Sequence, residues 1–485
     1  MLLAIDQGTS ATKAVLVDAS GGIVARGSAS VGQEHPRPGW VEQDAQAIWS
    51  SVREAVAVCL WQAESTPVEA VGLSTQRESV VLWERETGRP LGPLLSWQDQ
   101  RTADHAARLR DKGAGAMVRA SSGLPLDPMF SALKAAWLLD AHDPQRSRSR
   151  RGELCLGTVD SWLLSHFGGE HVIEIGNAAR TQLFDVRARR WDPELLALFG
   201  VPPQVLPQVV PSTGPFPVVR GLAPVPDGTP VTAVMGDSHA ALYAHAGWRP
   251  GYVKATYGTG SSIMSLGDPG VAGSDALCLT VAWDDGVPAY AFEGNIRSVG
   301  ATLAWLAELF GTTPADLAGR AAASSEGVHL VPAFGGLGAP WWDDEAVGLL
   351  SGLSFGVRLP QLARAALESV AFQVEDVAAA VHERHPVETL LADGGPTAND
   401  ALMQLQADTS GRRVEVALAR DLSALGAAHL AGRRVGMWDR ARLEALERPS
   451  RAFTPQEGDP ERRRRIAEWH GAVARARLRA HAVTG

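Results

Sequence analysis

The stretch from Val234 to Gly260 contains the residues whose types and spacing best suit catalysis. It holds one carboxylate, Asp237, among small residues, and a linker then leads to the glycine and threonine turn at 257–260. A carboxylate can act as a base, and such a turn can bring backbone N–H groups to a phosphate. The same residues also fit an ordinary linker in which Asp237 caps the helix that follows.

A second polar turn suited to an anion lies near the N-terminus. Leu2 to Ile5 predicts a strand that ends in Asp-Gln-Gly-Thr-Ser, and Ala14 to Val17 predicts the returning strand. The turn from Asp6 to Lys13 offers N–H groups and hydroxyls to a phosphate. Because Asp6 is itself acidic, we expect it to act through Mg²⁺ and its waters. A plain hairpin with a polar tip is the alternative.

Charged and aromatic residues follow two further apolar runs. The predicted strand Val71 to Ser74 leads to Arg77 and Glu78, at the strand end where open α/β sheets bind ligands. Arginine donates and a carboxylate accepts hydrogen bonds, so the pair suits a polyhydroxyl compound. A surface ion pair is the alternative. Trp97, after the run Leu91 to Ser96, suits the carbon skeleton of a sugar or polyol, or else the core.

The strands that position these residues occur in two similar sets. The N-terminal pattern of strand, turn and strand returns as Val253 to Thr256, the glycine turn and Ser262 to Leu266, with a third strand near Leu277 to Ala282. This repeat predicts a duplicated fold with nucleotide between the copies. Helical spacing is found at 44–61, 128–140, 294–310 and 362–381, and the tail from Asp439 reads as helical.

One more glycine turn follows a predicted strand, Leu390 to Ala392. The sequence then reads Asp-Gly-Gly-Pro-Thr-Ala-Asn and continues as a helix. Glycines let the backbone approach a flat ligand closely, and Asn399 can form a hydrogen bond to it.

Length and composition exclude several classes of protein. A chain of 485 residues is long enough for two or more domains. No apolar run is long enough to span a membrane, and the start has no signal-peptide pattern, which predicts a cytoplasmic protein. A net charge of −9 argues against nucleic acid as a partner. Cys59, Cys155 and Cys278 are far apart in sequence, which predicts buried thiols rather than disulfides or a zinc site.

Taken together, these motifs resemble the FGGY carbohydrate kinases, with the glycerol kinases the most similar members. The likeness runs from about Leu3 to Trp438 and includes AIDQGTS, QRES, WQDQRT, NAARTQLFD, GDSHAAL, TYGTGS and DGGPTAND. It implies an α/β fold of two actin-like, ribonuclease H-like domains with an ATP and substrate cleft between them. The implied ranges are 1–246 for a substrate-binding domain, 247–438 for a nucleotide-binding domain and 439–485 for a C-terminal helical tail.

The resemblance also implies roles at the matching positions. Asp237 is then the general base that takes the proton from the substrate hydroxyl, and Asp6 holds Mg²⁺ through water. The substrate site consists of Arg77, Glu78, Trp97, Met129, Asp237 and Ser238. Thr9, Ser10 and Lys13 match the first phosphate loop, Gly258 and Thr259 the second, and Gly300, Gly395 and Asn399 the adenosine pocket.

Several positions depart from the glycerol kinases. Met129 replaces a tyrosine that binds a substrate hydroxyl, and Ser238 replaces a longer glutamine, which leaves room for a larger substrate. Lys13 stands where an arginine is usual, and Ala304 where a glutamine lies near the nucleotide. The loop that binds a sugar bisphosphate inhibitor in some glycerol kinases is not recognisable before Asp237, so we expect no such feedback control.

We therefore predict a kinase that uses ATP and Mg²⁺ to phosphorylate a terminal hydroxyl of glycerol or a closely related polyol or sugar. A larger polyol or pentulose, such as erythritol, xylulose or ribulose, is the alternative that Met129 and Ser238 favour. An actin-like ATPase without small-molecule kinase activity is the alternative from another class, and it would not need all these substrate motifs. The resemblance further implies a homo-oligomer, either a dimer or a tetramer, with no nucleic acid or membrane partner.

Overall fold

The computed structural model describes residues 1–63, 67–270 and 275–478, which fold as two compact units. Unit 1 comprises Met1–Ala246, Leu279–Ala291 and Asp421–Glu447. Unit 2 comprises Gly247–Cys278, Phe292–Arg420 and Arg448–Gly485. Within the described ranges, no helix combines the length and the apolar character needed to cross a membrane.

The sheet of unit 1 has the strand order β13-β5-β1-β2-β3. The strands are β1 (Leu2–Gln7), β2 (Ala11–Val17), β3 (Ile23–Ser30), β5 (Ala70–Thr75) and β13 (Val231–Gly236). β1, β2 and β3 are antiparallel neighbours, whereas β5 runs parallel to both β1 and β13. The middle strands β1 and β5 are buried along almost their whole length, because both faces of the sheet are covered.

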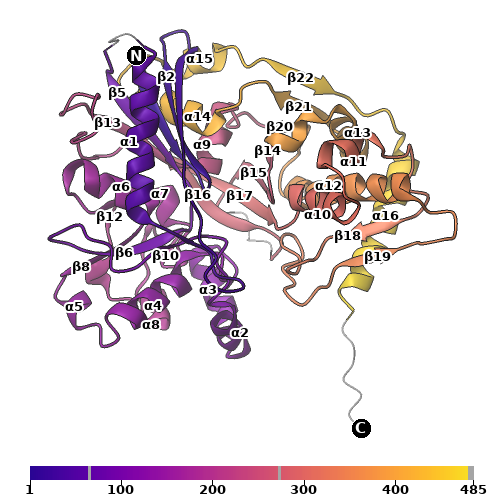
Figure 1. Ribbon diagram of the computed structural model, residues 1–485, viewed down its shortest axis with the longest axis horizontal. Coiled ribbons are helices and arrows are strands. Elements are labelled where there is room, and N and C mark those ends of the chain that lie inside the picture. Colours follow the sequence, from indigo (N-terminus) through magenta and orange to yellow (C-terminus); the bar gives the residue numbers. More distant parts are fainter. Residues whose placement is uncertain (64–66, 271–274, 479–485) are drawn as a thin grey trace. The chain divides into compact units, whose positions relative to one another are not determined.

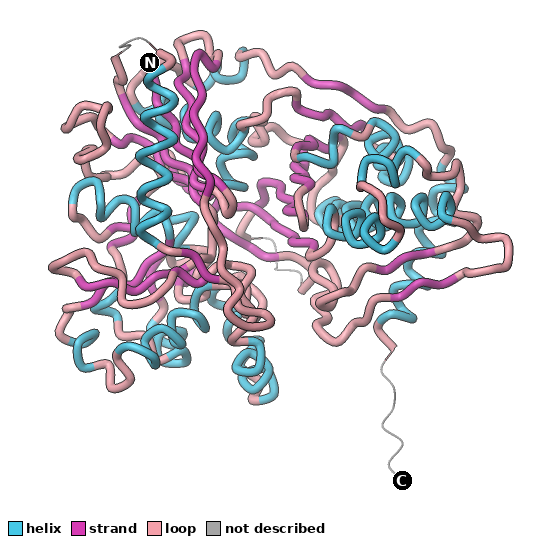
Figure 2. Tube along the Cα trace, in the orientation of Figure 1, coloured by secondary structure: helices cyan, strands magenta, loops and turns pink. Residues whose placement is uncertain are grey.

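Helices α1 (Ala45–Trp61) and α14 (Leu422–Arg434) cover opposite faces of this sheet. Figures 1 and 2 show α1 lying along the strands of unit 1. Glycines allow both helices to pack closely, since a Cβ at Gly27 would lie 2.0 Å from the Ala55 carbonyl oxygen of α1. A Cβ at Gly72 would lie 2.5 Å from the carbonyl oxygen of Ala427 in α14. The helix packing therefore depends on these two small residues.

Unit 1 contains further helices and strands. Its other helices are α2 (Ala103–Asp111), α3 (Ala114–Ser122), α4 (Ser131–His142), α5 (Ser147–Arg150), α6 (Val159–Gly168), α7 (Ile175–Ala178), α8 (Pro193–Phe199), α9 (Asp237–Ala244) and α15 (Arg440–Ala445). Its other strands are β4 (Glu42–Gln43), β6 (Val80–Glu84), β7 (Leu94–Leu95), β8 (Leu154–Thr158), β9 (Val172–Glu174), β10 (Phe184–Asp185), β11 (Arg190–Trp191), β12 (Gln208–Val210) and β16 (Cys278–Asp284).

Unit 2 repeats the strand order of unit 1. Its sheet runs β17-β15-β14-β20-β21-β22, and the first five strands correspond to β3-β2-β1-β5-β13. The strands are β14 (Tyr252–Tyr257), β15 (Ser261–Gly267), β17 (Pro288–Ile296), β20 (Thr389–Asp393), β21 (Arg413–Ala417) and β22 (Ser450–Phe453). β14 pairs antiparallel with β15 and parallel with β20, as β1 does with β2 and β5. This repeat confirms the predicted duplication.

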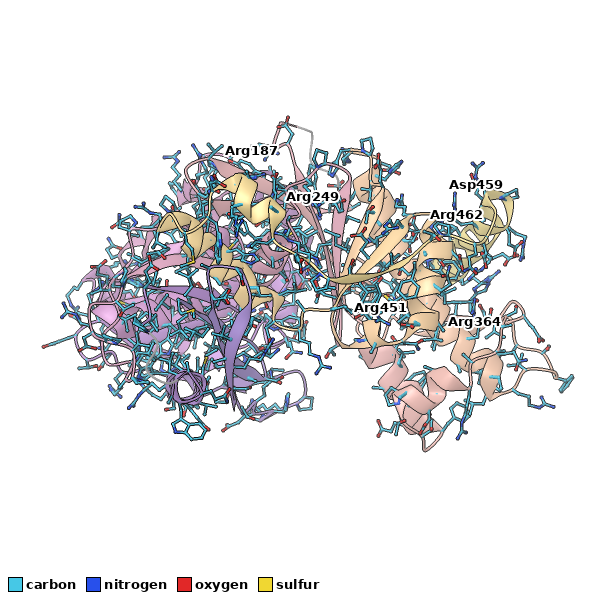
Figure 3. All side chains as sticks on the ribbon, turned by 90° about the horizontal axis from the view of Figure 1, so that it is seen from above. Arg187, Arg249, Arg364, Arg451, Asp459 and Arg462 are labelled. Atoms are coloured by element: carbon cyan, nitrogen blue, oxygen red, sulfur yellow. The ribbon has the colours of Figure 1, made fainter. Side chains whose placement is uncertain are left out.

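Helices and a small hairpin complete unit 2. They are α10 (Gly300–Leu309), α11 (Pro314–Gly319), α12 (Leu359–His382), α13 (Asp400–Ser410), α16 (Asp459–Ala476), β18 (His329–Val331) and β19 (Leu349–Ser351). Trp469 of α16 is buried and stacks on Phe372 of α12. At the start of α16, Arg462 pairs with Asp459 at 2.8 Å, and both are labelled in Figure 3.

The units differ from the predicted ranges. Residues 279–291 and 421–447, which the prediction placed in the second domain or the tail, belong to unit 1. Residues 421–447 belong there because α14 packs on β5 and β1 of unit 1. In the segment from 448 onward, β22 pairs with β21 and α16 contributes to a core cluster of unit 2.

Some predicted elements also need correction. The helix expected from Gly294 begins at Gly300, because β17 continues to Ile296. The strand expected near 277–282 is present as β16, but β17 is the strand that lies next to β15. All three cysteines are buried and free, which confirms the prediction of buried thiols.

Candidate active site

Three parallel strands bring the predicted catalytic residues of unit 1 together. The strand register places Asp6 of β1 beside Ser74 of β5, and Ser74 beside Met235 of β13. Arg77 and Glu78 follow β5, and Asp237 begins α9 directly after β13. The carboxyl ends of these strands therefore form one polar edge, as expected for a ligand site in an open α/β sheet.

Asp237 is held by the Arg77 guanidinium. Arg77 Nε lies 3.3 Å from Asp237 Oδ1, and the Ser238 backbone N–H donates to the same oxygen at 2.6 Å. The side chain of Arg77 is 5% exposed and that of Asp237 is 36% exposed. Gly236 makes this arrangement possible, since a Cβ there would lie 2.6 Å from Arg77 Cδ. Asp237 is not the helix cap of the alternative interpretation, because Gly236 occupies that position.

Asp6 shares this polar edge and is the candidate metal ligand. The Ser74 hydroxyl donates to Asp6 Oδ1 at 2.9 Å. Burial, followed by the charge of Asp237, raises the pKa of Asp6 to about 7. No cluster of three or more His, Cys, Asp or Glu side chains in the described ranges could hold a metal by itself. One or two carboxylates fit Mg²⁺ that is bound mainly by phosphates and water, because this ion keeps several waters.

Glu78 is buried and firmly held, which rules out a surface ion pair. Its Oε1 accepts a hydrogen bond from Arg180 Nε at 2.6 Å and lies 3.9 Å from Arg77 Nε. Its backbone has a φ of +63°, a conformation that L-residues rarely adopt. His239 Nε2 lies 3.4 Å from Arg77 Nη1 and is completely buried. Arg180 and His239 lie in recognised motifs, but sequence reasoning gave them no role.

Trp97 connects the predicted substrate wall to the first phosphate turn. Its indole N–H donates to the Thr9 hydroxyl at 3.0 Å, and its ring is half-buried rather than part of the core. The half-buried Met129 lies on a loop that Lys134 holds by donating to the carbonyl oxygens of Pro128 at 3.1 Å and of Met129 at 2.5 Å. Burial lowers the pKa of Lys134 to about 8. Ser238 is half-buried beside Asp237.

The first phosphate turn is open to solvent and carries a cation. Thr9 is half-buried and Ser10 is exposed between β1 and β2. Lys13 Nζ lies 3.4 Å from Asp421 Oδ1, and Arg26 Nε lies 3.1 Å from Asp421 Oδ2. Asp421 precedes α14 and was missed by sequence reasoning, because its partners are about 400 positions away along the chain.

The second glycine turn is built into unit 2 between β14 and β15. The Gly258 and Thr259 carbonyl oxygens accept hydrogen bonds from the Gly300 and Ala301 N–H groups at 2.9 and 3.1 Å. A Cβ at Gly300 would lie 2.6 Å from the Gly258 carbonyl oxygen, so this contact requires glycine. Because the turn already occupies these N–H groups of α10, the exposed Thr259 is the group of this turn best placed to bind a phosphate.

The third glycine turn of the prediction follows β20 in the same unit. Gly394 has a φ of +99°, and a Cβ there would lie 1.9 Å from the Tyr257 carbonyl oxygen. Gly394 and Gly395 are exposed, and nothing lies within 4 Å of a Cβ built on Gly395. Asn399 caps α13, since its side chain accepts from the Leu402 N–H at 3.1 Å. The turn therefore offers open backbone to a flat ligand.

The chain matches known proteins over almost its full length. Residues 1–244 and 253–435 match the N-terminal and C-terminal domains of the FGGY family of carbohydrate kinases. The apulose kinase of Pectobacterium atrosepticum is 41% identical, over 99% of both chains. A glycerol kinase of Aromatoleum aromaticum is 43% identical, over 98% of both chains. The crystal structure of Plasmodium falciparum glycerol kinase with ADP has a TM-score of 0.91 at 28% identity, and covers 99% of this chain and 98% of that one.

Proposed function

The chain belongs to the FGGY family of carbohydrate kinases and phosphorylates a sugar or polyol with ATP, and we propose that its acceptor is glycerol or a closely related polyol or sugar. The reaction would take place at a terminal hydroxyl of the acceptor. The observation that carries this proposal is the arginine that joins two carboxylates, since Arg77 lies 3.3 Å from Asp237 and 3.9 Å from Glu78. Such a group suits neighbouring hydroxyls.

Each of these side chains has a separate task in the proposed reaction. Asp237 accepts the proton of the reacting hydroxyl, and Arg77 keeps its carboxylate oriented. Glu78 accepts a hydrogen bond from a second hydroxyl, and Trp97 packs against the carbon chain. Phosphoryl transfer depends on alignment and charge neutralisation more than on covalent chemistry. The side chains of this edge can supply alignment and the base.

The nucleotide and its metal would use the glycine turns and Asp6. We assign the phosphates to Thr9, Ser10 and Lys13 and to Gly258 and Thr259, and the adenosine to Gly300, Gly395 and Asn399. Mg²⁺ neutralises phosphate charge when bound, and Asp6 would hold it through water. In this proposal residues 1–246 bind the acceptor and contribute the first phosphate turn, and residues 247–438 bind the rest of ATP.

A coupled assay of ADP release across glycerol, erythritol, xylulose, ribulose and apulose tests the acceptor. We expect glycerol to give the highest kcat/KM and Asp237→Asn to remove the signal for every acceptor. A glycerol rate no higher than the acceptor-free rate would contradict the proposal. ADP release that is independent of every acceptor would instead favour an actin-like ATPase.

A larger polyol or pentulose is the second candidate. Met129 offers no hydroxyl and Ser238 is short, so the site favours a bulkier acceptor than one lined by tyrosine and glutamine. The similarity to an apulose kinase supports the same candidate. A low KM for a pentulose together with a weak response to glycerol would establish it.

The remaining expectations are also testable. We propose a homo-oligomer, either a dimer or a tetramer, which light scattering during size-exclusion chromatography would identify. The predicted cytoplasmic location would be checked by fractionation of cells that express the protein.

A further inference from the structure

Glu78 needs help from its neighbours to hold its position. Its backbone lies in the left-handed region at a φ of +63°, and its carbonyl oxygen accepts a hydrogen bond from the Ser131 hydroxyl at 3.0 Å. Its side chain is 6% exposed, so the carboxylate cannot rely on water. A buried carboxylate in a strained backbone is costly unless surrounding groups fix it.

Arg180 is the group that fixes the carboxylate. It follows α7, its side chain is 0% exposed, and its Nε donates to Glu78 Oε1 at 2.6 Å. The guanidinium carbon lies 5.0 Å from the centre of the Phe130 ring, which restricts its orientation. A short contact between buried opposite charges is a strong hydrogen bond with a defined geometry.

Arg77 is a second arginine close to this carboxylate. Its Nε lies 3.9 Å from Glu78 Oε1 but only 3.3 Å from Asp237 Oδ1. Removing Arg180 would leave a buried charge that attracts Arg77 away from Asp237. A single distant arginine therefore influences both carboxylates of the site.

We propose that Arg180 is a positioning residue, which holds Glu78 ready for an acceptor hydroxyl and keeps Arg77 on Asp237. The inference rests on the proposed function of the site. Arg180 itself does not touch the acceptor in this proposal. Its loss therefore weakens acceptor use more than it weakens ATP use.

Steady-state kinetics of Arg180→Ala and Arg180→Lys, with the best acceptor of the panel, test this inference. Arg187→Met is the matched control, because Arg187 is an exposed arginine of the same segment and is labelled in Figure 3. We expect Arg180→Ala to lower kcat/KM for the acceptor about 10- to 100-fold, mainly through a higher acceptor KM, since a displacement of about 1 Å can cost about 100-fold in rate. The KM for ATP should stay within about twofold, and Arg187→Met should match the wild type.

Chemical rescue separates positioning from a general effect on folding. Guanidinium ion at millimolar concentration should enter the space left in Arg180→Ala and lower the acceptor KM, with no such effect on the wild type. If Arg180→Ala does not fold, Arg180→Lys carries the test through a selective rise of the acceptor KM. Two results would overturn this inference without affecting the proposed function. The first is an equal rise of the KM for acceptor and for ATP without rescue, and the second is a wild-type acceptor KM in both variants. A wild type that phosphorylates no acceptor would overturn the proposed function as well.

Discussion

Replacing Asp237 by asparagine removes the proposed base with little change in shape. Asparagine keeps an oxygen that can accept from Arg77, which lies 3.3 Å from Asp237 Oδ1, and from the Ser238 N–H. Arg77 also keeps Glu78 as a second acidic neighbour at 3.9 Å. The substitution therefore tests proton removal rather than the integrity of the site.

The size of the expected effect follows from these contacts. A positioned general base contributes about 10²- to 10⁴-fold, so kcat should fall by that factor, which corresponds to about 2.7 to 5.4 kcal/mol of activation free energy. The Asp237 side chain is 36% exposed, and a partly solvated ion pair is worth at most about 1 kcal/mol. We therefore expect the melting temperature to change by less than about 3 °C.

Turnover, melting temperature and ADP affinity should be measured on the same preparation of Asp237→Asn. The expected result is a stable protein that binds ADP as the wild type does and has very low kcat with every acceptor. A kcat within about tenfold of the wild type would refute the role of Asp237 as base. Loss of the fold would show instead that the Arg77 contact is structural.

Four other perturbations test separate parts of the molecule. Gly394→Ala would put a Cβ 1.9 Å from the Tyr257 carbonyl oxygen at a φ of +99°. We therefore expect a loss of more than about 1 kcal/mol of unfolding free energy, and weaker ADP binding by calorimetry. An unchanged melting temperature would contradict this expectation. Met129→Tyr adds a hydroxyl that can form one hydrogen bond to the acceptor, worth about 1 kcal/mol. This bond should raise kcat/KM for glycerol about fivefold relative to a pentulose. An unchanged ratio would place residue 129 away from the acceptor. The hydrogen bond to Asp376 raises the pKa of His470 above its ordinary 6.5, so this contact stabilises the fold fully below that pH and loses its effect as the pH rises through the raised value. His470→Gln should therefore lower the melting temperature more at about pH 5.5 than at about pH 8.5, and equal losses would exclude the charge. Chelation of Mg²⁺ should stop turnover and added Mg²⁺ should restore it, while turnover in the chelator would exclude the metal.

Local patterns were sufficient to predict most of the sheet and its turns. Leu2 to Ile5 and Val71 to Ser74 are short, mainly apolar runs that lead into polar residues, and Val253 to Thr256 leads into a glycine turn; each is part of a strand. The polar edge of unit 1 follows from the same signal, because a residue that follows a buried strand must lie at the strand's end. Local patterns failed at Gly294, because β17 continues to Ile296 and the helix begins only at Gly300.

Partners that are far apart in sequence were not predictable in this way. Nothing near Glu78 indicates that Arg180 will hold its carboxylate, and nothing near Lys13 indicates Asp421. These pairs depend on α7 and α14 reaching the strand ends of unit 1. The same packing takes Asp421–Glu447 into unit 1, although this segment lies after most of unit 2 in the chain.

The sequence by itself determined the strands, the glycine turns and the charged residues that follow them, because backbone propensity and hydrophobic periodicity act between near neighbours. Tertiary structure alone decided which arginine neutralises Glu78 and which carboxylate holds Lys13. Such contacts form only when the burial of apolar faces brings distant segments together. Because the hydrophobic effect is not directional, composition alone does not specify which residues become partners.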